Sequence, residues 1–238
     1  MNIANRADLE KRLARVVGKA LGEQRKQIVD LLGDPPNLDN LTPATWEALD
    51  ASLRAALAPE LQAIYLEQAR AMLEEDALGV DWALVNQAAA DWASRYSFEL
   101  VKGIGDNSRA ALQSAVSAYF EQGQTIGQLE GQLVDLFGPV RAESISVTEV
   151  TRAASMGESE IVSELAGTGI EMDEFWETNN DELVCPICGA AHHKEKDEPI
   201  DREPFNGKSW GEVYPDGPPA HPRCRCNKNH ALRGGKKK

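Results

Sequence analysis

The four cysteines of this 238-residue chain lie in two close pairs, and none precedes Cys185. The first pair is spaced C-x-x-C in Cys185-Pro186-Ile187-Cys188, and the second lies in His221-Pro222-Arg223-Cys224-Arg225-Cys226. Structural disulfides spread through a secreted protein do not give this distribution. Two clusters of soft ligands separated by residues 189–220 instead predict a metal ion that ties the loop between them shut.

The ligand set that the spacing favours is Cys185, Cys188, His221 and Cys224. Cys226 competes for the fourth position, and a set of four cysteines is an alternative. Tetrahedral ligation rich in thiolates favours Zn²⁺ over harder cations, and a closed site of this kind is structural rather than catalytic. Two other interpretations stay open, namely reduced cysteines that bind no metal and a disulfide.

The segment around the first cysteine pair is rich in proline and polar residues. Seven of the twelve prolines follow Val184. We expect short strands at 174–178 and 182–184, joined by a turn at 179–181. Residues 192–219 include few apolar side chains, so burial alone is not expected to overcome the conformational entropy of this segment. A bound metal ion would supply the missing stabilisation.

Four polar residues just beyond the first cysteine pair are further candidates: His192, His193, Glu195 and Asp197. The two histidines could act as additional ligands, or as a base beside the metal, and Glu195 and Asp197 could be their carboxylate partners. The simpler interpretation is that they are solvated loop residues next to a structural site. The chain lacks the H-E-x-x-H, G-x-S-x-G and phosphate-loop motifs of common enzyme classes, so we do not expect an enzyme.

The first 170 residues carry apolar side chains at the spacing of one helical face. Gly33-Asp34-Pro35-Pro36 and Gly138-Pro139 interrupt this pattern, and residues 103–107 are expected to form a loop. Thr125 is a predicted N-cap, and Pro59 is expected to kink or restart its helix. The pattern predicts helices over 9–32, 43–73, 81–101, 111–120, 126–137 and 140–166.

These observations predict a mainly α protein. An elongated, multi-helix N-terminal and central region would precede a small, irregular α+β C-terminal module that a Cys/His zinc site staples. The expected boundaries are a helical region at 1–105, a second helical region at 106–170, the metal-stapled module at 171–230 and a flexible basic tail at 231–238.

The charge of the chain limits its partners. Asp and Glu total 38 against 25 Lys and Arg, which gives a net charge of -13 and argues against nucleic-acid binding through the overall field. Seven of the 25 basic residues follow Pro222, where no acidic residue occurs, so this end could contact DNA weakly or only aid solubility. No stretch is apolar enough to span a membrane, and Met1–Arg6 lacks a signal-peptide core, so a cytoplasmic protein is expected.

Four sequence blocks carry a family resemblance. They are residues 111–129, the segment R-A-E-S-I-S-V-T-E-V-T-R-A at 141–153, residues 176–188, and P-P-A-H-P-R-C-R-C at 218–226. With these blocks the chain resembles the phage Mu F-like minor head protein family, also described as SPP1-type phage head morphogenesis proteins. Residues 106–170 would then be the helical part of the family's domain, and 1–105 its variable helical region.

The resemblance implies a minor capsid protein of a tailed bacteriophage. Its role would be structural, at or near the portal vertex, with a part in DNA packaging or ejection. The implied partners are the portal protein and the major capsid or scaffolding protein, in a head or procapsid assembled in the host cytoplasm. The alternatives are a zinc-ribbon-like nucleic-acid-binding adaptor and a metal-dependent hydrolase that uses His192, His193 or Glu195.

Overall fold

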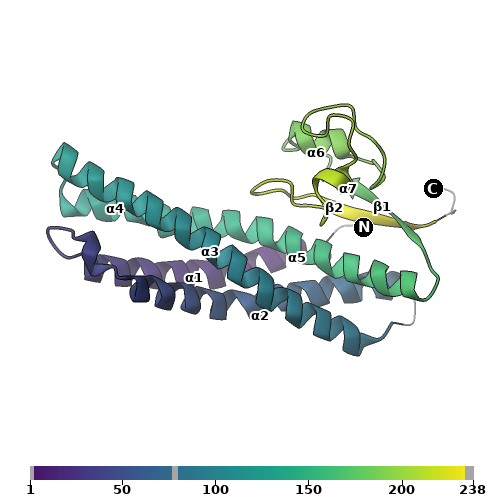
Figure 1. The fold of residues 1–238 in the computed structure, drawn as a ribbon, viewed down its shortest axis with the longest axis horizontal. Helices are drawn as coiled ribbons and strands as arrows, with labels where there is room; N and C mark the ends of the chain where they lie inside the picture. Colours follow the sequence, from purple (N-terminus) through teal and green to yellow (C-terminus); the bar gives the residue numbers. More distant parts are fainter. Residues whose placement is uncertain (1–2, 77–79, 234–238) are drawn as a thin grey trace. The chain divides into compact units, whose positions relative to one another are not determined.

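The structure is a computed structural model that describes residues 3–76 and 80–233 (Figure 1). It is mostly helical, with a small antiparallel sheet formed by β1 (Met172–Glu177) and β2 (Asn227–Leu232), which confirms the predicted fold class. None of the described helices is long and apolar enough to cross a bilayer. The helices are α1 (Arg6–Leu32), the 3₁₀-helix η1 (Leu38–Asn40), α2 (Pro43–Asp76), α3 (Trp82–Gln122), α4 (Ile126–Phe137), α5 (Pro139–Gly167), α6 (Pro186–Ala191) and α7 (Trp210–Val213).

The described chain divides into two compact units, and long helices run through both of them. The first unit contains residues 3–9, 61–76, 80–91 and 147–233. The second unit contains Glu10–Glu60 and Trp92–Ser146. Each unit is therefore assembled from segments that are far apart in the sequence.

The second unit is an all-helical bundle with a core of leucine, isoleucine and valine. In its core, the Gln24 side-chain amide donates a hydrogen bond of 2.9 Å to the carbonyl oxygen of Leu49. The Arg141 guanidinium donates to the carbonyl oxygens of Leu136 and Ile104 at 2.7 and 3.1 Å. Because helix ends leave carbonyls without intrahelical partners, the bond from Arg141 to Leu136 satisfies the end of α4.

Two helix boundaries in this unit, the end of α1 and the start of α4, follow the predicted signals. α1 ends where Gly33 adopts a φ of +73°, a backbone conformation that glycine tolerates. Thr125 caps α4 in a capping box with Gln128, as the sequence predicted. Pro59 neither ends nor restarts a helix, because it lies inside the single helix α2.

The predicted loop at 103–107 is wrong, because α3 continues through it. The side chain of Arg109 pairs with Asp50 on α2 at 2.9 Å and with Asp106 at 2.9 Å. A Cβ at position 105 would lie 2.7 Å from Asp50 Oδ1, so Gly105 leaves the space that this ion pair occupies. The low helix propensity of glycine at position 105 is therefore offset by the close contact between α3 and α2.

The helical part of the first unit also contains a close backbone contact. Gly157 on α5 faces α2, and a Cβ at this position would lie 2.4 Å from the carbonyl oxygen of Tyr65 and 3.4 Å from the amide nitrogen of Ala69. Ile64, Ala69 and Ile161 are fully buried around this crossing. The two helices can approach this closely only because residue 157 has no side chain.

The sheet of the first unit differs from the prediction. β1 overlaps the first strand expected at 174–178 and ends at Glu177. Its partner is β2, with Met172 opposite Leu232 and Glu177 opposite Asn227. The second strand predicted at 182–184 is wrong, because these residues lie in a turn that leads to the first cysteine pair. Sequence reasoning favoured the nearest extended segment, whereas the chain pairs β1 with a strand that follows the second cysteine pair. The predicted flexible tail at 231–238 is wrong at its start, because Ala231 and Leu232 belong to β2, and residues 234–238 lie outside the described residues.

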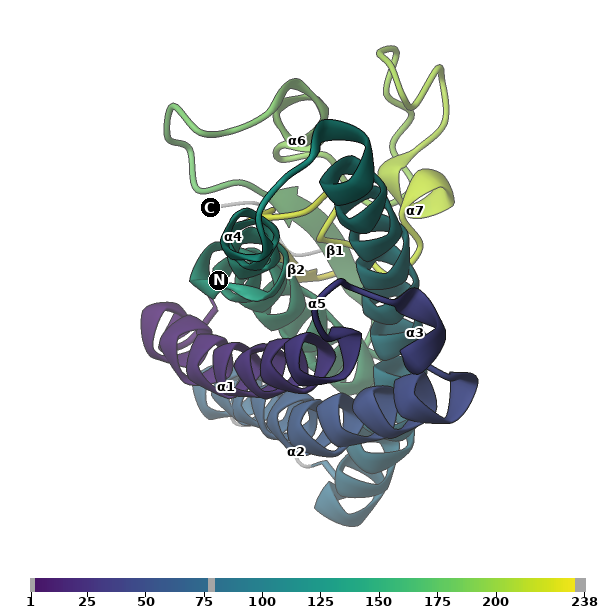
Figure 2. The same cartoon turned by 90° about the vertical axis from the view of Figure 1, so that its left-hand side faces the viewer.

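The C-terminal module, residues 171–233, has an apolar core of its own, so the expectation that it lacks one is wrong. Trp176, Phe205 and Trp210 are fully buried, and the two tryptophan rings meet edge to face at 5.6 Å between centroids. Trp210 Nε1 donates to the carbonyl oxygen of Lys194 at 2.8 Å, which satisfies its buried N–H. Figures 1 and 2 show the loops with α6 and α7 on one side of the β1–β2 ribbon and α5 on the other.

A buried charged network lies where β2 meets α5. Lys228 is 1% exposed, contacts Ser159 and lies 3.4 Å from a carboxylate oxygen of Glu174. Glu158 accepts a 2.8 Å hydrogen bond from Gln68. Burial raises the pKa of Glu158 to about 7, against the opposing effects of Lys228 and Gln68. Burial likewise lowers the pKa of Lys228.

The glycine contact leads to a stability prediction. Gly157→Ala should destabilise the protein by about 1–3 kcal/mol, because the new methyl group would overlap a backbone carbonyl oxygen that cannot rotate away. Gly103→Ala is the matched control, since a Cβ there meets no heavy atom within 4 Å. Removing a glycine from a helix interior should stabilise this control by up to about 1 kcal/mol. Urea unfolding measures both changes, and equal effects of the two substitutions would contradict the packing argument.

The raised pKa of Glu158 predicts a pH-dependent difference. A carboxyl whose pKa is raised in the fold stabilises fully below its ordinary pKa, and this contribution disappears as the pH rises through about 7. Glu158→Gln keeps the neutral form at every pH. The variant should match the wild type near pH 4.5 and exceed its unfolding free energy by about 3 kcal/mol above pH 7.

Urea unfolding of both proteins at each pH measures this difference. The comparison cancels the opposing contribution of His230, whose pKa burial lowers to about 4. A difference that does not change with pH would show that Glu158 does not titrate in this range.

Candidate metal centre

The first cysteine pair is positioned by the start of α6. Cys185 is the N-cap of this helix, Pro186 occupies its first turn, and the backbone N–H of Cys188 donates to Cys185 Sγ at 3.4 Å. Proline suits the first turn because the backbone N–H that it lacks has no intrahelical partner there. The turn therefore holds both sulfur atoms on the same side of the backbone.

His221 approaches this pair from the second cluster. Its Nε2 atom lies 3.1 Å from Cys185 Sγ and 3.4 Å from Cys188 Sγ. Its Nδ1 atom lies 2.8 Å from the carbonyl oxygen of Pro222, which can only accept a hydrogen bond. The proton therefore belongs on Nδ1, and the lone pair of Nε2 faces the two sulfurs, as in histidines that bind metals.

The second cysteine pair completes the cluster. Cys224 Sγ lies 3.8 Å from Cys188 Sγ, which is about the separation of two sulfurs bound to one tetrahedral zinc ion at ~2.3 Å. All four cysteines are free, so the disulfide interpretation finds no support. A cavity of about 20 Å³ lies beside Cys185, Cys188, His221 and Cys226, which is room for a single ion or water molecule.

The five predicted ligands form two overlapping groups that share Cys188. Cys185, Cys188 and His221 have ligand atoms within 4.8 Å of one another, and so do Cys188, Cys224 and Cys226. The structure therefore brings together the five predicted cysteine and histidine ligands, and this cluster could hold a metal ion. It leaves open whether Cys224 or Cys226 is the fourth ligand, as the sequence did.

The second group, Cys188, Cys224 and Cys226, consists of three buried thiols close to one another. Hydrogen bonds with Cys188 and Cys226 lower the pKa of Cys224, whereas hydrogen bonds with Cys224 and Cys226 raise the pKa of Cys188. Of these two sulfurs, Cys224 therefore ionises more readily than Cys188. A bound cation would neutralise the thiolate charge and allow further thiols to ionise.

Hydrogen bonds to α5 and to the start of α1 hold the second cluster in place. The backbone N–H of Arg223 donates to Thr148 Oγ1 at 2.8 Å, and Thr151 Oγ1 donates to the carbonyl oxygen of Cys224 at 2.8 Å. Arg6 donates to Thr151 Oγ1 at 3.1 Å and to the carbonyl oxygen of Cys226 at 3.0 Å. The backbone that carries three candidate ligands is therefore fixed by side chains from two distant segments.

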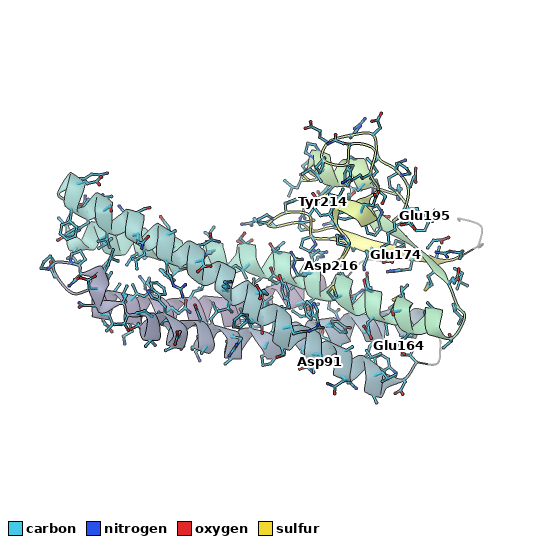
Figure 3. The ribbon with its side chains drawn as sticks, viewed as in Figure 1. Asp91, Glu164, Glu174, Glu195, Tyr214 and Asp216 are labelled. Carbon is cyan, nitrogen blue, oxygen red and sulfur yellow. The ribbon has the colours of Figure 1, made fainter. Side chains whose placement is uncertain are left out.

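Arg6 has no signal in the sequence that links it to the cysteines, and sequence reasoning missed it. Trp176 and Trp210 were also not recognised as the core beneath the site, although both are conspicuous aromatic residues in a polar region. Tyr214 joins this core, with its ring 5.8 Å from that of Trp176 (Figure 3). Burial raises the pKa of Tyr214, and the neighbouring cysteines add to this effect.

The other nominated polar residues do not join the cysteine cluster. His192 and His193 group with Glu177 instead. Glu195, labelled in Figure 3, forms an isolated antiparallel β-bridge with Phe175, in a segment that runs beside β1. Asp197 is an exposed loop residue, which agrees with the simpler interpretation given to it.

Comparisons of the chain with protein-family models, with curated proteins and with solved structures find no match. The resemblance to phage minor head proteins therefore rests on the four sequence blocks alone.

The geometry predicts an order of importance among the cysteines. Cys188→Ser should abolish binding of stoichiometric metal, because this sulfur belongs to both groups. Cys226→Ser should weaken binding less, because it leaves Cys185, Cys188, His221 and Cys224 intact. Elemental analysis after dialysis, together with competition against a chromophoric chelator, measures both effects. Equal losses in the two variants would contradict the central position of Cys188.

Proposed function

We propose that this chain is a minor head protein of a tailed bacteriophage, with a structural role in head assembly at or near the portal vertex. The sequence blocks that resemble this family are the first support. The second is that three of these blocks contact one another in the first unit, although they are far apart in the chain. Such mutual contact is expected of segments that act as one module.

The contact between the helix block and the cysteine blocks carries this proposal. Thr148 and Thr151 lie in the block at 141–153, and each bonds the backbone of the block at 218–226. The block at 176–188 supplies Trp176 to the core beneath the cluster and two cysteines to the cluster itself. Three of the four blocks thus supply the cysteine cluster, part of the core beneath it and its hydrogen bonds to α5.

We also propose that the bound ion is Zn²⁺ and that its role is structural. Thiolates dominate the donor set, and such sets favour zinc among the common cellular cations. An electron-rich sulfur site polarises a substrate weakly, so the donor set supports a staple rather than a catalyst. The ion would fix residues 185–188 against residues 221–226.

Basic residues near the C-terminal end are engaged within the chain, which disfavours the nucleic-acid-binding alternative. Arg225 donates to both carboxylate oxygens of Asp181, at 2.8 and 3.1 Å. Arg233 pairs with Glu171 and Asp173 at 2.7 and 2.9 Å. Lys228 is buried. A nucleic acid would have to compete with these carboxylates for three cations of the basic segment.

The proposed partners are the portal protein and the major capsid or scaffolding protein. The protein would dock through protein surfaces, as its net charge of -13 favours, rather than through DNA. Any contact of the basic segment with packaged DNA would be weak and sensitive to salt.

Purified procapsids and heads of the phage or prophage that encodes this chain should contain it, at low copy number relative to the major capsid protein. Quantitative mass spectrometry of gradient-purified particles tests this. Cys188→Ser should reduce particle yield or incorporation, whereas Asp197→Asn, an exposed substitution in the same module, should leave both unchanged. Particles that form normally and lack the chain would overturn the proposal.

A further inference from the structure

The C-terminal module contains a second group of possible metal ligands, separate from the cysteine cluster. Glu177 lies at the end of β1, His192 follows α6 as its C-cap, and His193 is the next residue. One ligand atom from each lies within 4.8 Å of the other two. Two imidazoles and one carboxylate are a donor set that suits divalent transition metals.

The carboxylate of Glu177 faces both imidazoles. Its Oε2 atom lies 3.2 Å from His193 Nδ1, and its Oε1 atom lies 3.6 Å from His192 Nδ1. The two rings are tilted by 31°, with their centroids 3.7 Å apart.

Backbone contacts, not only the carboxylate, bring these side chains together. The N–H of His193 donates to the carbonyl oxygen of Trp176 at 2.8 Å, and the N–H of Trp176 donates to the carbonyl oxygen of Lys194 at 3.0 Å. His193 has a φ of +60°, which is uncommon for a residue with a side chain. The fold thus holds a histidine in a left-handed conformation at this position.

The surroundings leave the group accessible while fixing part of it. The side chains of Glu177 and His192 are each 21% exposed, and that of His193 is 70% exposed. The backbone N–H of Thr178 donates to His192 Nδ1 at 3.2 Å, and Thr178 Oγ1 lies 3.2 Å from the same nitrogen, so the orientation of this ring is set by a neighbour.

We propose that Glu177, His192 and His193 form a second metal site, which binds a divalent transition-metal cation reversibly. Its donors are nitrogen and oxygen, so it prefers cations such as Ni²⁺ or Cu²⁺, whereas the sulfur cluster prefers Zn²⁺. Three protein donors leave coordination positions to solvent. The site is therefore open and exchangeable, and it is independent of the proposed role in head assembly.

Titration of the zinc-loaded full-length protein with Ni²⁺, followed by isothermal calorimetry, tests this site. We expect one equivalent of Ni²⁺ to bind without release of zinc, and the affinity to fall as the pH decreases, because protons compete for the imidazoles. His193→Asn should weaken binding at least about tenfold, a loss typical of damage to a metal site. Asparagine tolerates the left-handed backbone, so this variant should keep the fold.

Glu177→Gln should weaken Ni²⁺ binding similarly, and Asp197→Asn is the matched control that should bind as the wild type does. Paramagnetic broadening by Ni²⁺ of the His192 and His193 ring signals in NMR spectra provides a second measurement. Absence of a nickel equivalent in the wild type, or unchanged binding in His193→Asn, would overturn the proposal. Retention of the site in Cys188→Ser would separate it from the cysteine cluster.

Discussion

The meeting of two short ligand segments at Cys188 is the constraint on which the C-terminal module depends. Residues 185–188 and 221–226 must come within a few ångströms, although residues 189–220 separate them. The cost of closing such a loop is entropic and grows slowly with its length. A metal ion that binds both segments in the fold, and has no preformed site in the unfolded chain, would offset this cost directly.

The ion would not act alone, because the loop folds over an aromatic core. Trp176, Phe205 and Trp210 are fully buried beneath the cysteines, and Cys188, Cys224 and Cys226 belong to the same cluster. Burial of large aromatic side chains contributes roughly 1.5–3 kcal/mol each. Metal ligation and apolar packing would thus stabilise the same arrangement, because the cysteines pack directly against the aromatic core.

Much of this arrangement could be predicted from the sequence because its signals are local. Helix periodicity, the Thr125 cap and the Gly33 stop depend on neighbouring residues, and the structure has them as expected. The cysteine spacing likewise predicted that five side chains would converge. Such features can be predicted because they depend on residues that are close together in the sequence.

The errors arose where a distant segment decides the structure. Gly103 and Gly105 favour a loop by propensity, but Asp50 on another helix makes a close approach useful. β1 does not pair with the strand predicted at 182–184. Its partner is β2, which follows the second cysteine pair in the sequence. Residues 192–219 contain many polar side chains, which predicted poor packing. The segment nevertheless has a core, because Phe205 and Trp210 each bury a large aromatic side chain.

The hydrogen bond from Arg6 to the carbonyl oxygen of Cys226 joins positions 220 residues apart. During synthesis, the guanidinium of Arg6 leaves the ribosome long before its acceptor does. The first unit can therefore close only after residue 226 has been synthesised, whereas the helices of the second unit have their partners much earlier. A chain that stops before residue 226 lacks this contact, so its incomplete first unit should be more open to proteases than the finished one.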